Sequence, residues 1–127
     1  MPSQRRILLV DDDDSVREVT RACLELIGGY HVDSASSGHE CLELSLTSRP
    51  DAILLDVMMP GLDGPSTFGK LQEREETRNL PVVLLTAKTQ EADLRRFAEL
   101  GVAGVLRKPF DPMTLSDQVA ELFGWTR

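Results

Sequence analysis

The sequence contains few of the residues that mark several common classes of protein. Its two cysteines, Cys23 and Cys41, lack the spacing of a metal or redox motif and fall in apolar helical patterns, so both are expected to be buried, reduced thiols. No apolar run reaches the roughly 18 residues of a membrane-spanning helix. The first residues show no signal-peptide pattern. These absences predict a cytoplasmic protein without a membrane anchor.

Positive charge is also scarce. The 14 lysines and arginines are outnumbered by 21 acidic residues, which gives a net charge of -7. Direct binding to nucleic acid is not expected, because it requires basic patches. The isolated His31 and His39 are predicted to lie at the surface. With 127 residues and 41% hydrophobic content, the chain can form one core, so a single domain over residues 1–127 is expected.

Apolar runs with the character of buried strands alternate with stretches of helical periodicity along the whole sequence. Strands are expected at residues 5–10, 30–35, 52–56, 81–86 and 103–107. Helices are expected at residues 14–28, 37–48, from about 65, 89–100 and 111–124. This alternation predicts an α/β fold: a doubly wound, flavodoxin-like, five-stranded parallel sheet in the order 2-1-3-4-5, with five helices covering both faces.

Local signals predict several helix boundaries. Ser37 and Glu40 have the spacing of a capping box, and Asp111, which precedes a proline, is predicted to be the N-cap of the last helix. Asp63 is expected to be a turn residue beside a conformationally permissive Gly64. The helix over residues 14–28 is expected to bury one apolar face, made of Val16, Val19, Cys23, Leu26 and Ile27.

Polar residues stand where four of the expected strands end. Asp11 and Asp12 follow the first strand, Asp56 ends the third, Thr86 ends the fourth and Lys108 follows the fifth. The carboxyl ends of parallel strands lie at one edge of a sheet, and in the predicted order the first and third strands are neighbours. Carboxylates gathered there repel one another unless a hard cation joins them. The pattern therefore predicts a cation site at this edge.

The order and spacing of these residues resemble the receiver domain of two-component response regulators. The motifs that carry the resemblance are Val10-Asp11-Asp12, Leu55-Asp56, the loop 59–64, Thr86-Ala87 and Lys108-Pro109-Phe110. They cover about residues 5–123, nearly the whole chain. Each motif alone is weak, whereas their combined order is specific. The strand order expected above is also the one found in such receivers.

The resemblance implies a role for each of these residues. Asp56 would be the nucleophile that accepts a phosphoryl group from a phosphohistidine of a histidine kinase or a histidine phosphotransfer protein. Lys108 would pair first with Asp56 and then with a phosphoryl oxygen. The Thr86 hydroxyl and the Ala87 amide would contact the remaining oxygens. The chain would catalyse only its own phosphorylation and dephosphorylation, and would act as a signalling switch.

The same resemblance implies a magnesium cofactor. Asp12 and Asp56 would bind Mg²⁺ directly, and Asp11 would bind it through water. The main-chain carbonyl of Met58 would be a further ligand. Pro109 would follow a cis peptide. The phosphodonor would dock on the first helix and on the loop after the fifth strand.

Some features depart from the family or leave other functions open. Val105 stands where many receivers carry tyrosine or phenylalanine, so a muted aromatic-type switch is expected. A pseudo-receiver that signals without phosphorylation is possible, although the intact acid cluster argues against it. Asp11 and Asp13 fit the Asp-x-Asp of haloacid dehalogenase-type phosphatases, but no cap domain is present. A flavin carrier is disfavoured by the acidic crevice. Asp13 and Asp14 are expected to form the acidic start of the helix over residues 14–28.

Overall fold

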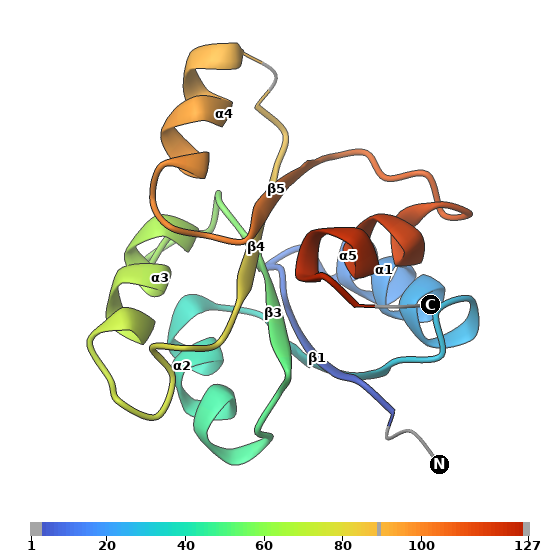
Figure 1. The fold of residues 1–127 in the computed structure, drawn as a ribbon, viewed down its shortest axis with the longest axis horizontal. Helices are drawn as coiled ribbons and strands as arrows, with labels where there is room; N and C mark the ends of the chain where they lie inside the picture. Colours follow the sequence, from blue (N-terminus) through green and yellow to red (C-terminus); the bar gives the residue numbers. More distant parts are fainter. Residues whose placement is uncertain (1–3, 89, 126–127) are drawn as a thin grey trace.

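Five parallel strands form one sheet at the centre of the fold (Figure 1). The structure is a computed structural model and describes residues 4–88 and 90–125. The strands are hydrogen-bonded in the order β2-β1-β3-β4-β5. The predicted fold class and strand order are therefore confirmed. The bounds of the strands are β1 (Arg6–Val10), β2 (His31–Ala35), β3 (Ala52–Asp56), β4 (Val82–Thr86) and β5 (Gly104–Arg107).

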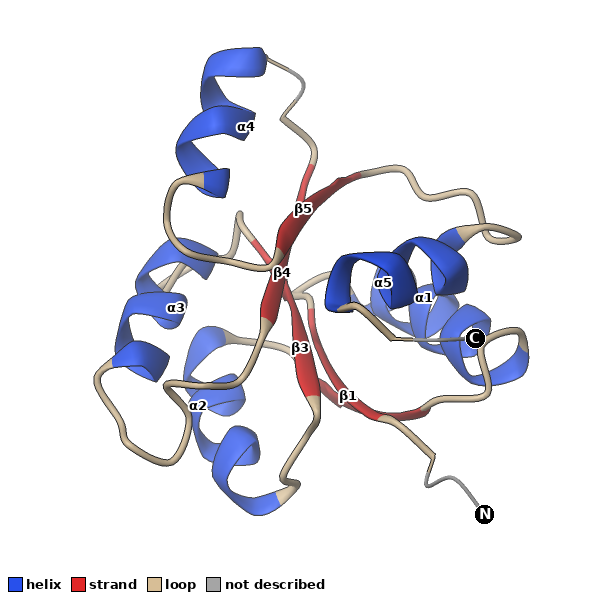
Figure 2. Cartoon of the chain, viewed as in Figure 1, coloured by secondary structure: helices blue, strands red, loops and turns tan. Residues whose placement is uncertain are grey.

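Helices cover both faces of this sheet, as Figure 2 shows. One side carries α1 and α5, and the other carries α2, α3 and α4. The predicted number of helices is confirmed for the part of the chain that the structure describes. The bounds of the helices are α1 (Asp14–Leu26), α2 (Gly38–Thr47), α3 (Gly64–Gln72), α4 (Glu91–Ala98) and α5 (Leu115–Phe123).

The strands alternate their side chains between two apolar clusters, one on each face of the sheet. On β1, Leu8 and Val10 belong to the cluster under α2, α3 and α4, whereas Ile7 and Leu9 belong to the cluster under α1 and α5. All four are completely buried. Burying such a side chain contributes about 2 kcal/mol each. A sheet covered on both faces explains why these strands are continuous apolar runs.

Side-chain caps begin the first two helices as expected. The Asp13 carboxylate accepts a hydrogen bond from the Val16 amide at 3.0 Å, so Asp13 is the N-cap of α1. Ser37 Oγ accepts from the Glu40 amide at 3.1 Å. The Glu40 carboxylate reaches back to the amide of Ser36 at 2.7 Å, one residue earlier than the usual capping-box partner. Both helix starts are therefore stabilised locally.

The prediction for the buried face of α1 was wrong. Thr20 and Leu24 are the buried residues of this helix, while Val19 is 60% exposed and Leu26 is 85% exposed. Ile27 is exposed as well, so the apolar spacing identified the helix but not the residues that it buries. Cys23 belongs to the predicted face and is only half-buried, contrary to expectation.

The second thiol follows the prediction. Cys41, on α2, is completely buried, and burial raises its pKa to about 12. His39 is exposed, as predicted. His31 is partly covered, with its Nε2 atom 3.4 Å from an oxygen of Asp33. None of the helices within residues 4–88 and 90–125 has the length and apolar character needed to cross a membrane.

The loop after β3 is organised differently from the prediction. Asp63 is the N-cap of α3, and its carboxylate accepts from the Ser66 amide at 2.8 Å. Gly64 is needed for space, not for an unusual backbone angle. A Cβ atom there would lie 2.4 Å from the main-chain oxygen of Asp56. The start of α3 therefore packs directly against the end of β3.

The last two helices begin later than predicted. Thr89, the expected start of α4, lies outside the described residues, and α4 begins at Glu91. Asp111 does not cap α5, which begins at Leu115. Its carboxylate accepts instead from the Met113 amide at 2.9 Å, in the turn before that helix. The proline after Asp111 therefore belongs to this turn and not to α5.

Candidate functional site

The sheet brings the acids of the two central strands to one edge. Asp11 directly follows β1, and Asp56 is the last residue of β3, its neighbour in the sheet. Both residues are buried, whereas Asp12 is exposed. One carboxylate oxygen from each of Asp11, Asp12 and Asp56 lies within 4.8 Å of the others. The predicted acid cluster is therefore present.

Lys108 reaches this cluster from the segment after the edge strand β5. It follows β5, and its Nζ atom lies 2.7 Å from Asp11 Oδ2 and 3.3 Å from Asp56 Oδ1. Lys108 pairs with Asp56, as expected for the unphosphorylated site, and its shorter contact is with Asp11. Burial lowers the pKa of Lys108, but the hydrogen bond to Asp11 and the charges of both acids outweigh it and raise the pKa overall.

Asp56 is held in an environment that disfavours its charge. Burial is the main cause and raises the pKa of Asp56, and the positive charge of Lys108 opposes this rise. The negative charges of Asp11 and Asp12 raise it further, which brings the pKa of Asp56 from 3.8 to about 6. A carboxylate in this state gains from a second cation that offsets the repulsion.

The remaining predicted residues stand at the same edge. Thr86 ends β4 and is buried, and its Oγ1 atom accepts a hydrogen bond from the Lys88 amide at 2.9 Å. Ala87, the next residue, is exposed, so its amide lies in the loop that borders the cluster. The side chain of Met58 is 64% exposed. The peptide between Lys108 and Pro109 is cis, as predicted.

Val105 lies on β5. It is half-buried and packs against the apolar cluster under α2, α3 and α4. A valine leaves no ring at this place in β5. The expected muted switch stays a prediction.

A second cation at the site was missed by the sequence reasoning. Arg17 on α1 donates from Nη1 to the main-chain oxygen of Asp11 at 2.7 Å, and Nη2 pairs with Asp14. The available signal was the spacing of Asp14 and Arg17, three residues apart on one helix. That spacing is common on exposed helix surfaces and did not indicate a contact with Asp11.

The donor set of the acid cluster fits magnesium. Asp11, Asp12 and Asp56 offer hard carboxylate oxygens from two adjacent segments, and one of the three residues is open to solvent. Mg²⁺ prefers oxygen ligands and keeps several waters, so it suits a partly open site with few protein ligands. A site for a soft metal would require thiolate or imidazole groups instead.

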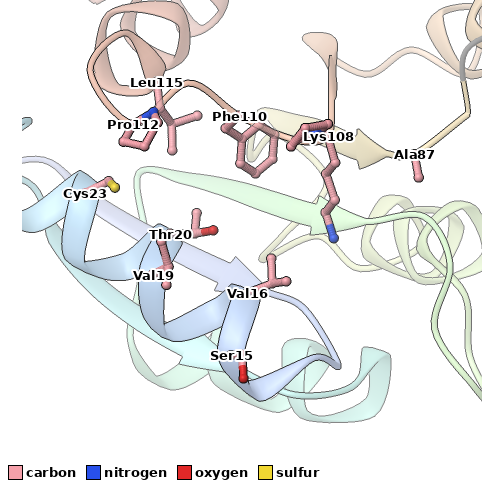
Figure 3. A pocket seen from close by; sticks show the side chains of 11 residues that line it. Ser15, Val16, Val19, Thr20, Cys23, Ala87, Lys108, Phe110, Pro112 and Leu115 are labelled. Carbon is pink, nitrogen blue, oxygen red and sulfur yellow. The ribbon is translucent and has the colours of Figure 1, made fainter.

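An apolar groove adjoins the cluster (Figure 3). It has a volume of about 560 Å³ and lies between α1 and the segment that leads from β5 into α5. Its lining reaches Lys108 and Ala87 at the acid cluster. The groove therefore connects directly with the site. Its other lining residues are mainly apolar, among them Val16, Val19, Cys23, Phe110 and Leu115.

This combination of strand-end acids, threonine and lysine can be compared with known proteins. A family model described as the response regulator receiver domain matches residues 7–120. The chain belongs to this family. As a receiver domain it is part of the two-component signalling systems, whose receivers act as switches.

Curated relatives of this receiver domain are named as transcriptional regulators or response regulators. It is 39% identical over 115 residues to the alkaline phosphatase synthesis transcriptional regulatory protein PhoP of Bacillus subtilis, covering 91% of this chain and 47% of that protein. It is 42% identical over 105 residues to the response regulator MprA of Mycolicibacterium vanbaalenii, covering 83% of this chain and 44% of that protein. The chain spans about half the length of the curated relatives it matches.

Solved receiver structures share the fold over nearly the whole chain. The chemotaxis protein CheY4 of Vibrio cholerae is 29% identical with a TM-score of 0.86, covering 94% of this chain and 99% of that one. The receiver domain of a sensor histidine kinase from Pseudomonas aeruginosa is 30% identical with a TM-score of 0.84, covering 96% and 99%. The latter structure is described as having a magnesium ion coordinated in its active-site cleft.

Proposed function

We propose that this receiver domain, a single domain over residues 1–127, is a phosphoacceptor that transfers a phosphoryl group from a partner phosphohistidine to Asp56 in the presence of Mg²⁺. The observation that carries this proposal is the meeting of Asp56 with Asp11, Asp12 and Lys108 at one sheet edge. A pure scaffold has no need for three clustered acids, where burial and then the charges of the other two raise the pKa of Asp56.

Asp56 is the nucleophile in this proposal. An oxygen of its carboxylate attacks phosphorus, the bond between phosphorus and the imidazole nitrogen breaks, and the electron pair leaves with the imidazole. Asp12 and Asp56 would hold the metal directly, Asp11 would hold it through water, and the Met58 carbonyl would be a further ligand. A bound Mg²⁺ neutralises negative charge on the acids and on the phosphoryl oxygens.

The other residues position the phosphoryl group. Lys108 already contacts Asp56, so its ammonium group can pair with an oxygen of a phosphoryl group on Asp56 without a large movement. The Thr86 hydroxyl and the Ala87 amide stand at the end of β4 and receive the remaining oxygens. Phosphoryl transfer depends on positioning and on charge neutralisation, so this set is sufficient. The Lys88 amide donates to Thr86 Oγ1, so the hydroxyl keeps its own hydrogen for a phosphoryl oxygen.

Treatment with acetyl phosphate tests this function. In the presence of Mg²⁺ we expect the intact mass to rise by one phosphoryl group, and we expect no rise when EDTA removes the metal, because the acids then repel the incoming phosphate. Electrospray mass spectrometry of the untreated and treated protein measures both results. An unchanged mass with Mg²⁺ would favour the alternative, a pseudo-receiver that binds partners without phosphorylation.

The apolar groove supports a histidine kinase or a histidine phosphotransfer protein as the partner. A phosphohistidine must approach Asp56 on a protein surface, and the groove offers apolar contacts that extend from Lys108 along α1. Val19 in the groove lining and Leu26, about two helix turns further along α1, extend this apolar strip, and both are exposed. A helix of the partner that lies along α1 would bury this strip and present its histidine at the acid cluster.

Val19→Asp tests the docking surface. We expect transfer from a phosphorylated histidine kinase that labels the unaltered protein to become slower by about tenfold, because a charge would be buried in the contact. Acetyl phosphate labelling should persist, since it requires no docking. Radiolabelled phosphotransfer at limiting kinase measures the rate. Leu46→Asp, at an exposed leucine on α2, is the matched control. Equal rates for the two variants would exclude α1 as the docking face.

A further inference from the structure

Arg17 makes contacts that do not resemble an ordinary surface ion pair. Its side chain is only 17% exposed, whereas that of its ion-pair partner Asp14 is 85% exposed. An exposed acid at this spacing contributes little, because water and salt screen the pair. The second contact, from Nη1 to the main-chain oxygen of Asp11 at 2.7 Å, is made in a partly buried place. Charge-assisted hydrogen bonds of this kind are among the strong ones.

The carbonyl that Arg17 contacts lies between two of the three clustered acids. A peptide unit is planar, so holding the oxygen of Asp11 also holds the amide of Asp12 and the direction in which Asp12 leaves the strand. Asp12 is the exposed member of the cluster, and the structure shows it beside two buried acids. Arg17 is therefore placed to orient Asp12 without touching its carboxylate.

The other polar atoms of Asp11 are already bonded to separate elements. Its amide donates to the Ala35 oxygen at the end of β2 at 3.1 Å. Its carboxylate accepts from the Asp13 amide at 2.9 Å and from Lys108 at 2.7 Å. The main-chain oxygen is the remaining polar group, and Arg17 supplies its partner. Removal of Arg17 would leave this buried carbonyl without that charged donor, at a position next to Asp12.

We propose that Arg17 is a positioning residue for the acid cluster: its guanidinium group holds the peptide between Asp11 and Asp12 so that both carboxylates face the same cation. This inference rests on the proposed function, because it concerns the Mg²⁺ that the cluster would bind. The two contacts of Arg17 require two donors on one side chain, one for the main-chain oxygen of Asp11 and one for the Asp14 carboxylate. Arginine provides a planar fork, whereas lysine provides a single point of charge.

Calorimetric titration with MgCl₂ tests the proposal. We expect Arg17→Ala to weaken Mg²⁺ binding by about tenfold, as the loss of an outer-shell partner of a metal ligand does. Arg17→Lys keeps the charge and one donor, and should recover part of the affinity. With acetyl phosphate, Arg17→Ala should need more Mg²⁺ for half-maximal labelling but reach the unaltered maximal rate. A lower maximal rate with unchanged Mg²⁺ dependence would overturn the positioning role.

Arg21→Ala is the matched control. Arg21 lies on the same helix, but it pairs with Glu25, at a distance of 3.4 Å, and not with the acid cluster. It should leave Mg²⁺ affinity unchanged. Amide hydrogen exchange in EDTA gives a metal-free readout: the Asp13 amide, bonded to Asp11, should exchange faster in Arg17→Ala and not in Arg21→Ala. Unaltered exchange and affinity in Arg17→Ala would refute the inference. Absent Mg²⁺ binding by the unaltered protein would instead refute the proposed function.

Discussion

Asp56→Asn is expected to abolish phosphorylation. The amide that replaces the carboxylate is a poor nucleophile, and the substitution removes one of the two carboxylates that would bind the metal directly. Asp11 and Asp12 stay in place, but neither lies on β3, the strand paired with β4, whose Thr86 and Ala87 would contact the phosphoryl oxygens. Acetyl phosphate with Mg²⁺ should therefore add no mass to the variant, while the unaltered protein gains one phosphoryl group. Intact-mass spectrometry over a time course measures the difference.

Asp63→Asn is the control for this loss. Asp63 follows the same strand and caps α3 through an oxygen that asparagine also provides, so the fold of the loop should be kept. This variant should be labelled at the rate of the unaltered protein. If Asp56→Asn were labelled as readily as the unaltered chain, another residue would be the acceptor, and peptide mapping of the labelled protein would identify it.

The arrangement of the acid cluster could be predicted because it depends on strand positions. Asp11 and Asp56 directly follow or end apolar runs, and parallel strands place such residues on one edge. The two strands are neighbours only in the doubly wound order, which the alternation of strands and helices indicates. The predicted strand ends agree with the structure to within one residue. That precision is enough to predict which carboxylates lie at the edge of the sheet.

Contacts that depend on helix rotation could not be predicted in this way. The apolar stripe of α1 was assigned to the core, but Thr20 and Leu24 face the sheet. The stripe is instead available to a partner, and an apolar pattern is the same in either case. The contact between Arg17 and the Asp11 oxygen depends on one side-chain conformation and on how α1 sits against β1. Neither can be obtained from spacing along the sequence.

The raised pKa of Asp56 leads to a second large expected effect, on stability in the absence of metal. The folded state keeps a proton on Asp56 up to about pH 6, whereas the unfolded chain loses it near 3.8. Between these values the folded state binds more protons, so the free energy of unfolding falls as pH rises. The loss amounts to about 2 kcal/mol, after a reduction of the full shift for solvent screening. Above this window both states are ionised and the loss is constant.

Comparison of the unaltered protein with Asp56→Asn isolates the contribution of Asp56 to the free energy of unfolding. The other acids titrate in both proteins, so their contributions cancel in the difference. In EDTA the variant should gain about 2 kcal/mol relative to the unaltered protein between about pH 4 and pH 7, measured by urea unfolding. Lys108 keeps its closer partner, Asp11, in the variant. A difference that does not change with pH would show that Asp56 ionises normally. Added Mg²⁺ should reverse the trend in the unaltered protein, since metal binding requires the ionised form. The burial and the repulsion that disfavour ionised Asp56 in the metal-free fold would then be offset by the cation.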